Sequence, residues 1–186
     1  MIITIGRQLA AGGRAAGRRV AERLGLRYYD KELILEAARQ SGLSPDMFLR
    51  ADEQLGLFTL ALNTDTQKLF QLQSDTIRRL AEAGNCLFVG RAADYVLRDR
   101  HDLLSVFLTA DTADRIMRIM SGQHLSEREA RLLVERADRR RAGFYNFYTN
   151  RRWGDASGYD LCLNTSRLGI DRTADLIVQT ARLFNS

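Results

Sequence analysis

The sequence predicts an α/β protein in which a five-stranded parallel sheet lies between helices on both faces. Short apolar segments rich in β-prone residues alternate with segments whose apolar residues recur at helical spacing. This alternation is typical of parallel sheets, because their crossover connections place helices on both faces. The chain has 186 residues, of which 45% are apolar and 27% charged. Such a chain forms one globular domain with one main core.

Strands and helices are expected to alternate along most of the chain. The expected strands cover residues 2–5, 26–30, 86–89, 103–108 and 160–164. The expected helices cover residues 15–24, 31–40, 66–83, 94–97 and 111–122, and further helices start at Ser126 and Asp171. Ser126 and Glu129 have the spacing of a capping box. Ser44-Pro45 is a helix-start signal, and residues 50–66 are interpreted as mixed helix and loop.

A loop of small residues joins the first strand to the first helix. Small residues let backbone N–H groups close around an anion, and the start of a helix adds partial positive charge. The match to the phosphate-loop pattern Gly-x-x-x-x-Gly-Lys-[Ser/Thr] is incomplete. Gly6 and Gly12 are one residue too far apart, and Gly13 stands where lysine is expected. Ala15 and Ala16 offer no hydroxyl to magnesium.

Two interpretations of this loop are open. In the first, the loop binds phosphate, and Arg14 substitutes for the missing lysine from a neighbouring position. In the second, the loop is a tight strand-to-helix turn whose glycines are present only for their backbone freedom.

The charge of the chain permits an anionic ligand. The net charge is +5, and only two of the 28 basic residues, Lys31 and Lys68, are lysines. Arginine is suited to bidentate phosphate contacts. A nucleotide, a phosphate or a nucleic acid would therefore fit this balance.

Cysteine usage and the absence of targeting signals favour a cytoplasmic location. Cys86 and Cys162 each lie beside strand-like residues, which indicates buried thiols and no disulfide framework. No cysteine–histidine spacing typical of a metal site occurs. No apolar run is long enough to span a membrane, and no signal core follows the N-terminus. A reducing compartment is the expectation that follows.

Two further polar positions come directly after expected strands. Asp30 ends the second strand, and Gly90-Arg91 follows the third. Parallel sheets bind ligands beyond the carboxyl ends of their strands, so these residues and the glycine loop could share one edge. Asp30 could equally cap the helix that starts at Lys31. A structural ion pair is the alternative for Arg91.

A basic and aromatic segment follows Ser126. Its arginines are Arg128, Arg131, Arg136, Arg139, Arg140, Arg141, Arg151 and Arg152. Its aromatic residues are Phe144, Tyr145, Phe147, Tyr148 and Trp153. The arginines could form a solvated helix face, in which Glu135 reaches Arg139 and Asp138 reaches Arg141. The aromatic residues fit core packing or lid hinge contacts better than base stacking.

Four motifs taken together resemble the cytidylate kinase-like family of P-loop nucleoside monophosphate kinases. The resemblance runs nearly end to end. Its carriers are Ile3-Thr4-Ile5-Gly6-Arg7-Gln8 with Gly12-Gly13-Arg14, Tyr28-Tyr29-Asp30-Lys31-Glu32-Leu33, Val89-Gly90-Arg91-Ala92-Ala93-Asp94-Tyr95 and Asn164-Thr165-Ser166-Arg167-Leu168-Gly169-Ile170.

The resemblance implies a three-layer P-loop NTPase fold with a helical, arginine-rich lid, in a single domain over residues 1–186. Residues 31–83 would form an acceptor-side helical region, and residues 126–156 the lid. ATP and Mg²⁺ are the implied cofactors, with magnesium held mainly by phosphates and water. The implied partners are a nucleoside triphosphate and a small phosphorylated acceptor. No membrane or nucleic-acid partner is expected.

The resemblance also implies site residues. The residues implied to hold the donor phosphates are Gly6, Arg7, Gln8, Ala10, Ala11, Gly12, Gly13 and Arg14. The residues implied to contact the acceptor are Asp30, Arg91 and Asp94. The residues implied to act in catalysis are Arg14, Arg139 and Arg141, which would neutralise the charge of the transferring phosphoryl group.

Departures from the family pattern keep a second function open. The loop lacks the lysine and the hydroxyl. After the third strand, this chain has Gly90-Arg91-Ala92 where the family has Gly-Arg-Asp. The leading hypothesis is ATP-dependent phosphoryl transfer to a nucleoside monophosphate, CMP-like or dCMP-like, or to a related small acceptor. The alternative is a nucleotide-sensing module without catalysis, and a third hypothesis is a nucleic-acid-binding protein.

Overall fold

The computed structural model describes residues 1–30 and 64–184. The helices expected over residues 31–40 and after Ser44-Pro45 lie outside these ranges, as does most of the acceptor-side region. Among the described residues, no helix is both long enough and apolar enough to cross a lipid bilayer.

Five parallel strands form one sheet, as the sequence predicts. The strands are β1 (Ile2–Arg7), β2 (Arg27–Tyr29), β3 (Cys86–Val89), β4 (Leu103–Thr109) and β5 (Leu161–Asn164). Their order in the sheet is β2-β3-β1-β4-β5. Because β1 lies in the centre, the loop that follows it emerges in the middle of the carboxyl edge of the sheet.

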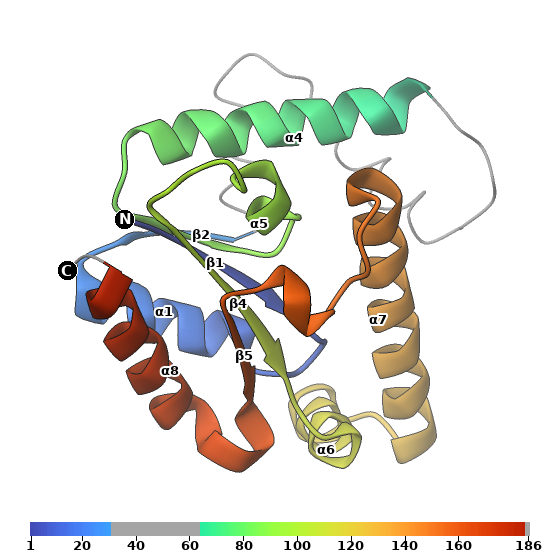
Figure 1. The fold of residues 1–186 in the computed structure, drawn as a ribbon. Helices are drawn as coiled ribbons and strands as arrows, with labels where there is room; N and C mark the ends of the chain where they lie inside the picture. The colour runs from blue at the N-terminus through green and yellow to red at the C-terminus, as the bar shows by residue number, and fades with distance from the viewer. Residues whose placement is uncertain (31–63, 185–186) are drawn as a thin grey trace.

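Helices cover both faces of the sheet (Figure 1). On one face, α1 (Gly13–Leu24) and α8 (Thr165–Phe184) pack on apolar side chains that include Ile3, Ile5 and Val106. On the other, α4 (Thr64–Glu82) and α5 (Ala93–Val96) pack on a second set that includes Phe88. Strands covered on both sides must be apolar throughout, which explains the uninterrupted apolar run of β3.

Two helices stand beyond the carboxyl ends of the strands (Figure 1). These are α6 (Thr112–Gln123) and α7 (Glu127–Thr149), and a short 3₁₀ helix, η1 (Ala156–Gly158), follows them. Ser126 and Glu129 form the predicted capping box at the start of α7. Ile116 and Ile119 of α6 pack with α7 and with loop residue Leu9. The segment expected to be a lid is therefore a long helix in contact with the glycine loop.

α8 consists of two helical segments, because Gly169 interrupts it with a non-helical φ of 72° and ψ of 168°. The segment after Gly169 agrees with the helix expected to open at Asp171, whereas the segment from Thr165 was not expected. Cys86 is buried and both cysteines are free, but Cys162 is exposed. Burial of Cys162 was expected because it lies in an apolar strand. That prediction was wrong because β5 is at the edge of the sheet, where neighbouring elements cover less of it.

Candidate active site

The glycine loop has two left-handed residues of the kind found in anion-binding nests, and its Leu9 and Ala11 N–H groups already donate to Asp138 and to the Gln8 carbonyl. β1 ends at Arg7 and α1 begins at Gly13. Between them, Ala10 has a φ of 57° and Gly12 a φ of 77°. Left-handed residues within such a loop turn successive N–H groups toward one side, and an alanine in this conformation is uncommon. No side chain caps the N-terminus of α1, so the first N–H groups of this helix are also available to a ligand.

A cavity of about 600 Å³ lies beside this loop. The loop, the end of β3, α5 and α7 all contribute to its wall. The lining residues are Gly6, Arg7, Gln8, Leu9, Ala10, Gly12, Gly13, Arg14, Ala15, Gly90, Arg91, Ala92, Asp94, Arg140, Arg141, Phe144, Tyr145, Trp153 and Tyr159. The fold therefore brings the loop, Arg91, Asp94 and Arg141 together, which are residues the sequence singled out from three separate segments.

Positive charge is concentrated at the base of this cavity. Burial and the nearby guanidinium groups of Arg141, Arg91 and Arg14 lower the pKa of Arg7 to about 9. Burial is also the main cause that lowers the pKa of Arg141. Both groups stay charged at pH 7 and repel each other in a partly dehydrated space. An anionic ligand would relieve this repulsion.

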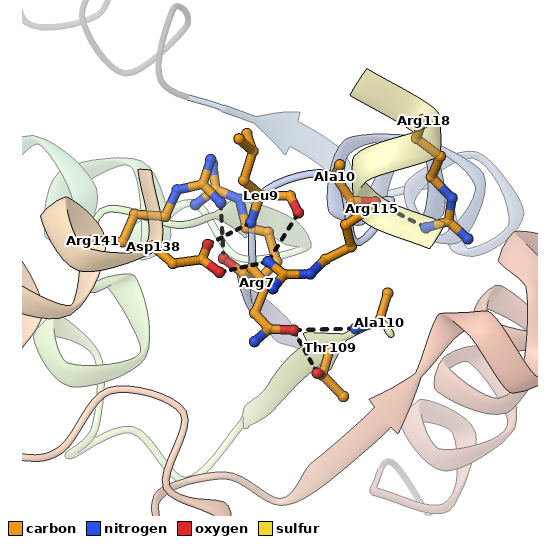
Figure 2. Close-up of polar contacts among 10 residues, drawn as sticks. Arg7, Leu9, Ala10, Thr109, Ala110, Arg115, Arg118, Asp138 and Arg141 are labelled. Atoms are coloured by element: carbon orange, nitrogen blue, oxygen red, sulfur yellow. Dashed lines mark hydrogen bonds and ion pairs between the residues drawn. The ribbon is translucent and has the colours of Figure 1, made fainter. Parts of the chain in front are cut away.

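An ion pair joins α6 to α7, and hydrogen bonds fasten both helices to the loop (Figure 2). The Asp138 carboxylate accepts the Leu9 N–H at 2.8 Å and lies 2.5 Å from Nη1 of Arg115. Nη1 of Arg118 donates to the Ala10 carbonyl at 2.8 Å, and Nη1 of Arg141 donates to the Arg7 carbonyl at 3.1 Å. The Arg115 side chain is only 6% exposed. The helices thus hold the loop in its nest conformation.

In the cavity wall, Asp94 of α5 and Tyr145 of α7 form a buried pair. The Tyr145 hydroxyl donates to Oδ2 of Asp94 at 2.6 Å. Burial raises the pKa of Asp94, and the hydrogen bond from Tyr145 opposes this rise. The pKa of Tyr145 is raised by burial and by the Asp94 charge. The tyrosine therefore acts as a donor, and the carboxylate keeps a fixed orientation in the cavity wall.

Sequence comparison shows the family of the chain. The family model described as the cytidylate kinase-like family matches residues 2–167. The chain belongs to this family. Two curated proteins named cytidylate kinase are similar to it. One, from Methanopyrus kandleri, is 27% identical over 95% of this chain and 91% of its own length. The other, from Methanothrix thermoacetophila, is 29% identical over 90% of each chain.

Solved structures place this cytidylate kinase-like chain in the P-loop kinase fold. An uncharacterised protein from Eubacterium ventriosum matches with a TM-score of 0.80 and 26% identity over 98% of both chains. Shikimate kinase from Bacteroides thetaiotaomicron matches with a TM-score of 0.62 and 14% identity, also over 98% of both chains. The second likeness is one of fold alone. Family membership and kinase-fold neighbours together support a nucleotide kinase role.

Within this kinase-like loop, the pattern can be aligned on Gly12. Gly-x-x-x-x-Gly-Lys-[Ser/Thr] then places its first glycine at Arg7, its lysine at Gly13 and its hydroxyl at Arg14. The hydroxyl position is therefore Arg14, which precedes Ala15 and Ala16, the two residues at which a hydroxyl had been sought. Gly6, which seemed one residue too far away, belongs to β1.

Three residues that the resemblance implied do not line the cavity. Ala11, a residue of the loop, is fully buried. The Asp30 carboxylate is buried and lies 3.9 Å from Nε of Arg14 and 3.8 Å from Nη2 of Arg18. Arg139 is 76% exposed and pairs with Glu135 at 3.6 Å, the pairing expected of a solvated helix face.

The aromatic residues of α7 mostly pack on other rings. Phe70 of α4 stacks on Tyr148 with a centroid distance of 4.2 Å and meets Phe144 edge-on at 5.8 Å. Trp153 lies edge-on to Phe107 at 5.3 Å. This packing is what the sequence favoured over base stacking.

The Arg115–Asp138 contact was not expected from the sequence. Asp138 was expected to reach Arg141 within α7, whereas its carboxylate pairs with Arg115 of α6. A signal was present, because Arg115 lies four residues before Ile119 and therefore on the apolar face of its helix. Gln8 was named only through the resemblance. Its Oε1 accepts from the Thr109 hydroxyl at 2.5 Å and the Ala110 N–H at 3.2 Å, which ties the loop to the end of β4.

Asp94→Asn is expected to stabilise the protein at pH 7 and to lose this advantage in acid. The folded-state pKa of Asp94 is raised, so the folded protein binds a proton more readily than the unfolded chain. Its stability therefore falls as pH rises from the unfolded value through the folded value. Urea unfolding at pH 7 and at pH 4 measures the difference. Asp155→Asn is the control of opposite sign, because its hydrogen bonds to Ser157 lower the pKa of Asp155. An Asp94→Asn effect of equal size at both pH values would contradict the prediction.

Proposed function

We propose that this protein transfers the γ-phosphoryl group of ATP to a nucleoside monophosphate, CMP or dCMP, or to a related small acceptor. One observation carries the proposal: an anion-binding nest, Arg91 and the α7 arginine Arg141 line a single cavity. Phosphoryl transfer needs positioning and charge neutralisation more than covalent help from the protein. This cavity offers both.

The roles follow from position. The loop would hold the donor phosphates through its N–H groups, because both the nest and the start of α1 favour anions. Arg91, at the end of β3, would bind the acceptor phosphate. Asp94 would orient the acceptor from α5, held by Tyr145. Arg141 would neutralise the transferring group, because its Nη1 already lies against the loop at the Arg7 carbonyl.

Magnesium would be held by substrate phosphates and water. The charged residues at the two ends of the loop, Arg7 and Arg14, are arginines, and Arg14 stands at the hydroxyl position, so these side chains supply cations and not metal ligands. Among residues 1–30 and 64–184, no group of three or more metal-ligating side chains occurs. Magnesium bound through phosphates keeps several waters in any case, and it would add to the neutralisation of phosphate charge.

A nucleotide-sensing module is the second candidate. Gly13 supports it, because the lysine that usually reaches the β- and γ-phosphates in this loop is missing.

We also propose a cytoplasmic location, since both cysteines are free thiols, as in a reducing compartment.

The direct test is a panel assay with ATP and Mg²⁺ and with CMP, dCMP, UMP, AMP or GMP as the acceptor. We expect ADP formation that depends on one acceptor. Arg141→Ala is expected to lower kcat/KM by about 100-fold or more, as loss of an arginine at the transferring phosphoryl group does.

Two more variants on the same helix provide the comparison. Arg139→Ala is expected to lower kcat/KM by less than about tenfold, because that side chain lies in solvent. Arg136→Ala, on another exposed side chain, serves as the control. Equal losses in all three variants would count against a specific role for Arg141. Saturable ATP binding without turnover on any acceptor would favour the sensing module.

A further inference from the structure

The Arg7 side chain crosses the mouth of the glycine loop. A Cβ atom added to Gly13 would lie 2.7 Å from Cγ of Arg7, so the aliphatic stem passes directly over the first residue of α1. A Cβ atom added to Gly90 would lie 1.7 Å from Nη1 of Arg7, so the guanidinium rests on the backbone at the end of β3. The side chain thus passes two bare α-carbons, with its stem at Gly13 and its guanidinium at Gly90, in the wall of the cavity.

This guanidinium is surrounded by other cations. Among residues 1–30 and 64–184, no carboxylate forms an ion pair with Arg7, and the groups that depress its pKa besides burial are Arg141, Arg91 and Arg14. A buried charge without an opposite charge is destabilising. A protein retains such a charge where a ligand supplies the missing partner.

Arg14 is less well placed for this role, although the sequence favoured it. Its side chain is 57% exposed, and its Nε lies 3.9 Å from the buried carboxylate of Asp30. That carboxylate already offsets part of the charge of Arg14. Arg7 combines burial, cationic neighbours and a position over Gly13.

We propose that Arg7 is the phosphate-binding cation of this loop and takes the place of the absent lysine. In the pattern aligned on Gly12, glycine precedes the loop and lysine follows it, whereas this chain has Arg7 first and Gly13 last. The cation and the glycine have exchanged positions. The bare α-carbon of Gly13 is what allows the Arg7 stem to reach the space that a lysine side chain would fill. The ligand is the β- and γ-phosphates of a nucleoside triphosphate, an identity that rests on the proposed function.

The test is calorimetric titration with two ligands, inorganic tripolyphosphate and ATP with Mg²⁺. Arg7→Met and Arg7→Gln are each expected to lower the affinity for both ligands by about 10- to 100-fold, which corresponds to one charge-assisted contact. Arg7→Lys is expected to recover part of the loss. Arg14→Met is expected to lose less than Arg7→Met. The control is Arg18→Met, because Arg18 also lies beside Asp30 but does not line the cavity.

Thermal unfolding separates this role from a structural one. Without ligand, Arg7→Met is expected to melt at a higher temperature than the wild type, because a repelled and dehydrated charge is removed. With tripolyphosphate it is expected to show a much smaller rise in Tm than the wild type. A lower Tm without ligand together with unchanged tripolyphosphate affinity would overturn the inference, as would an equal or larger loss in Arg14→Met.

The results for wild-type turnover and for tripolyphosphate binding test the kinase proposal and the Arg7 inference separately. Loss of tripolyphosphate binding in Arg7→Met, with no turnover by the wild type on any acceptor, supports the inference and counts against the kinase. Turnover by the wild type with tripolyphosphate affinity unchanged in both Arg7→Met and Arg7→Gln supports the kinase and overturns the inference.

Discussion

Gly90→Ala is expected to weaken triphosphate binding by about 30-fold or more, a loss similar to that of the Arg7 contact itself. The new methyl group would occupy the position of Nη1 of Arg7 and push the guanidinium out of the cavity wall. The φ of Gly90 is +77°, so the substitution also costs about 1–2 kcal/mol of backbone strain. Calorimetric titration with ATP and urea unfolding measure the two effects.

Gly84→Ala separates strain from displacement. Gly84 has a φ of +61°, and no heavy atom lies within 4 Å of an added Cβ. Both variants are therefore expected to carry a similar backbone strain, about 1–2 kcal/mol. Only Gly90→Ala is expected to lose ligand affinity. If both variants bound ATP with equal affinity, ATP binding would not depend on the position of the Arg7 guanidinium at Gly90.

Arg115→Met is expected to lower the free energy of unfolding by about 3–5 kcal/mol. The substitution leaves the Asp138 carboxylate, which is 18% exposed, without its charged partner between α6, α7 and the loop. Urea unfolding measures the loss. Arg131→Met is the matched control, because Arg131 pairs with Glu127 at a similar distance, 2.9 Å, on an exposed surface. Its expected loss is below about 1 kcal/mol.

The double variant Arg115→Met/Asp138→Leu refines this prediction. With both charges removed, part of the stability is expected to return, because an apolar pair carries no unpaired charge. The recovery is expected to be incomplete, since the Leu9 N–H loses its acceptor. Equal losses in the free energy of unfolding for Arg115→Met and Arg131→Met would show that the Arg115–Asp138 pair contributes no more to stability than an exposed ion pair.

The elements of this fold could be predicted because their signals are local. β3 is a short, wholly apolar run, as a strand covered on both faces must be. The capping box at Ser126 marks the start of α7 within four residues of sequence. Because β1 and β3 are parallel neighbours, the glycine loop and Arg91 were expected at one edge of the sheet, and both line the cavity.

The missing parts of the site depend on contacts between distant segments. The path of Arg7 needs bare α-carbons at Gly13 and Gly90, and these positions meet only after the sheet has formed. The partner of Asp138 lies on another helix, although Arg141 was available within the same turn of sequence.

The choice between two arginines could have been made from sequence. Positions 139 and 141 of a helix point about 200° apart, so both cannot face one cavity. Asp138, Arg141 and Tyr145 follow the spacing of one helix face.

That shared face has a thermodynamic consequence. Through Asp138 and Arg141, α7 contacts the loop that would hold the donor, and through Tyr145 it contacts Asp94 on the opposite wall. One helix thus connects the two places at which we propose that ligands bind. Any displacement of α7 that the first ligand favours changes the affinity for the second, and by reciprocity the second changes the affinity for the first by the same factor. A ternary complex of such a protein is cooperative in one direction or the other, according to whether the two ligands prefer the same position of the helix.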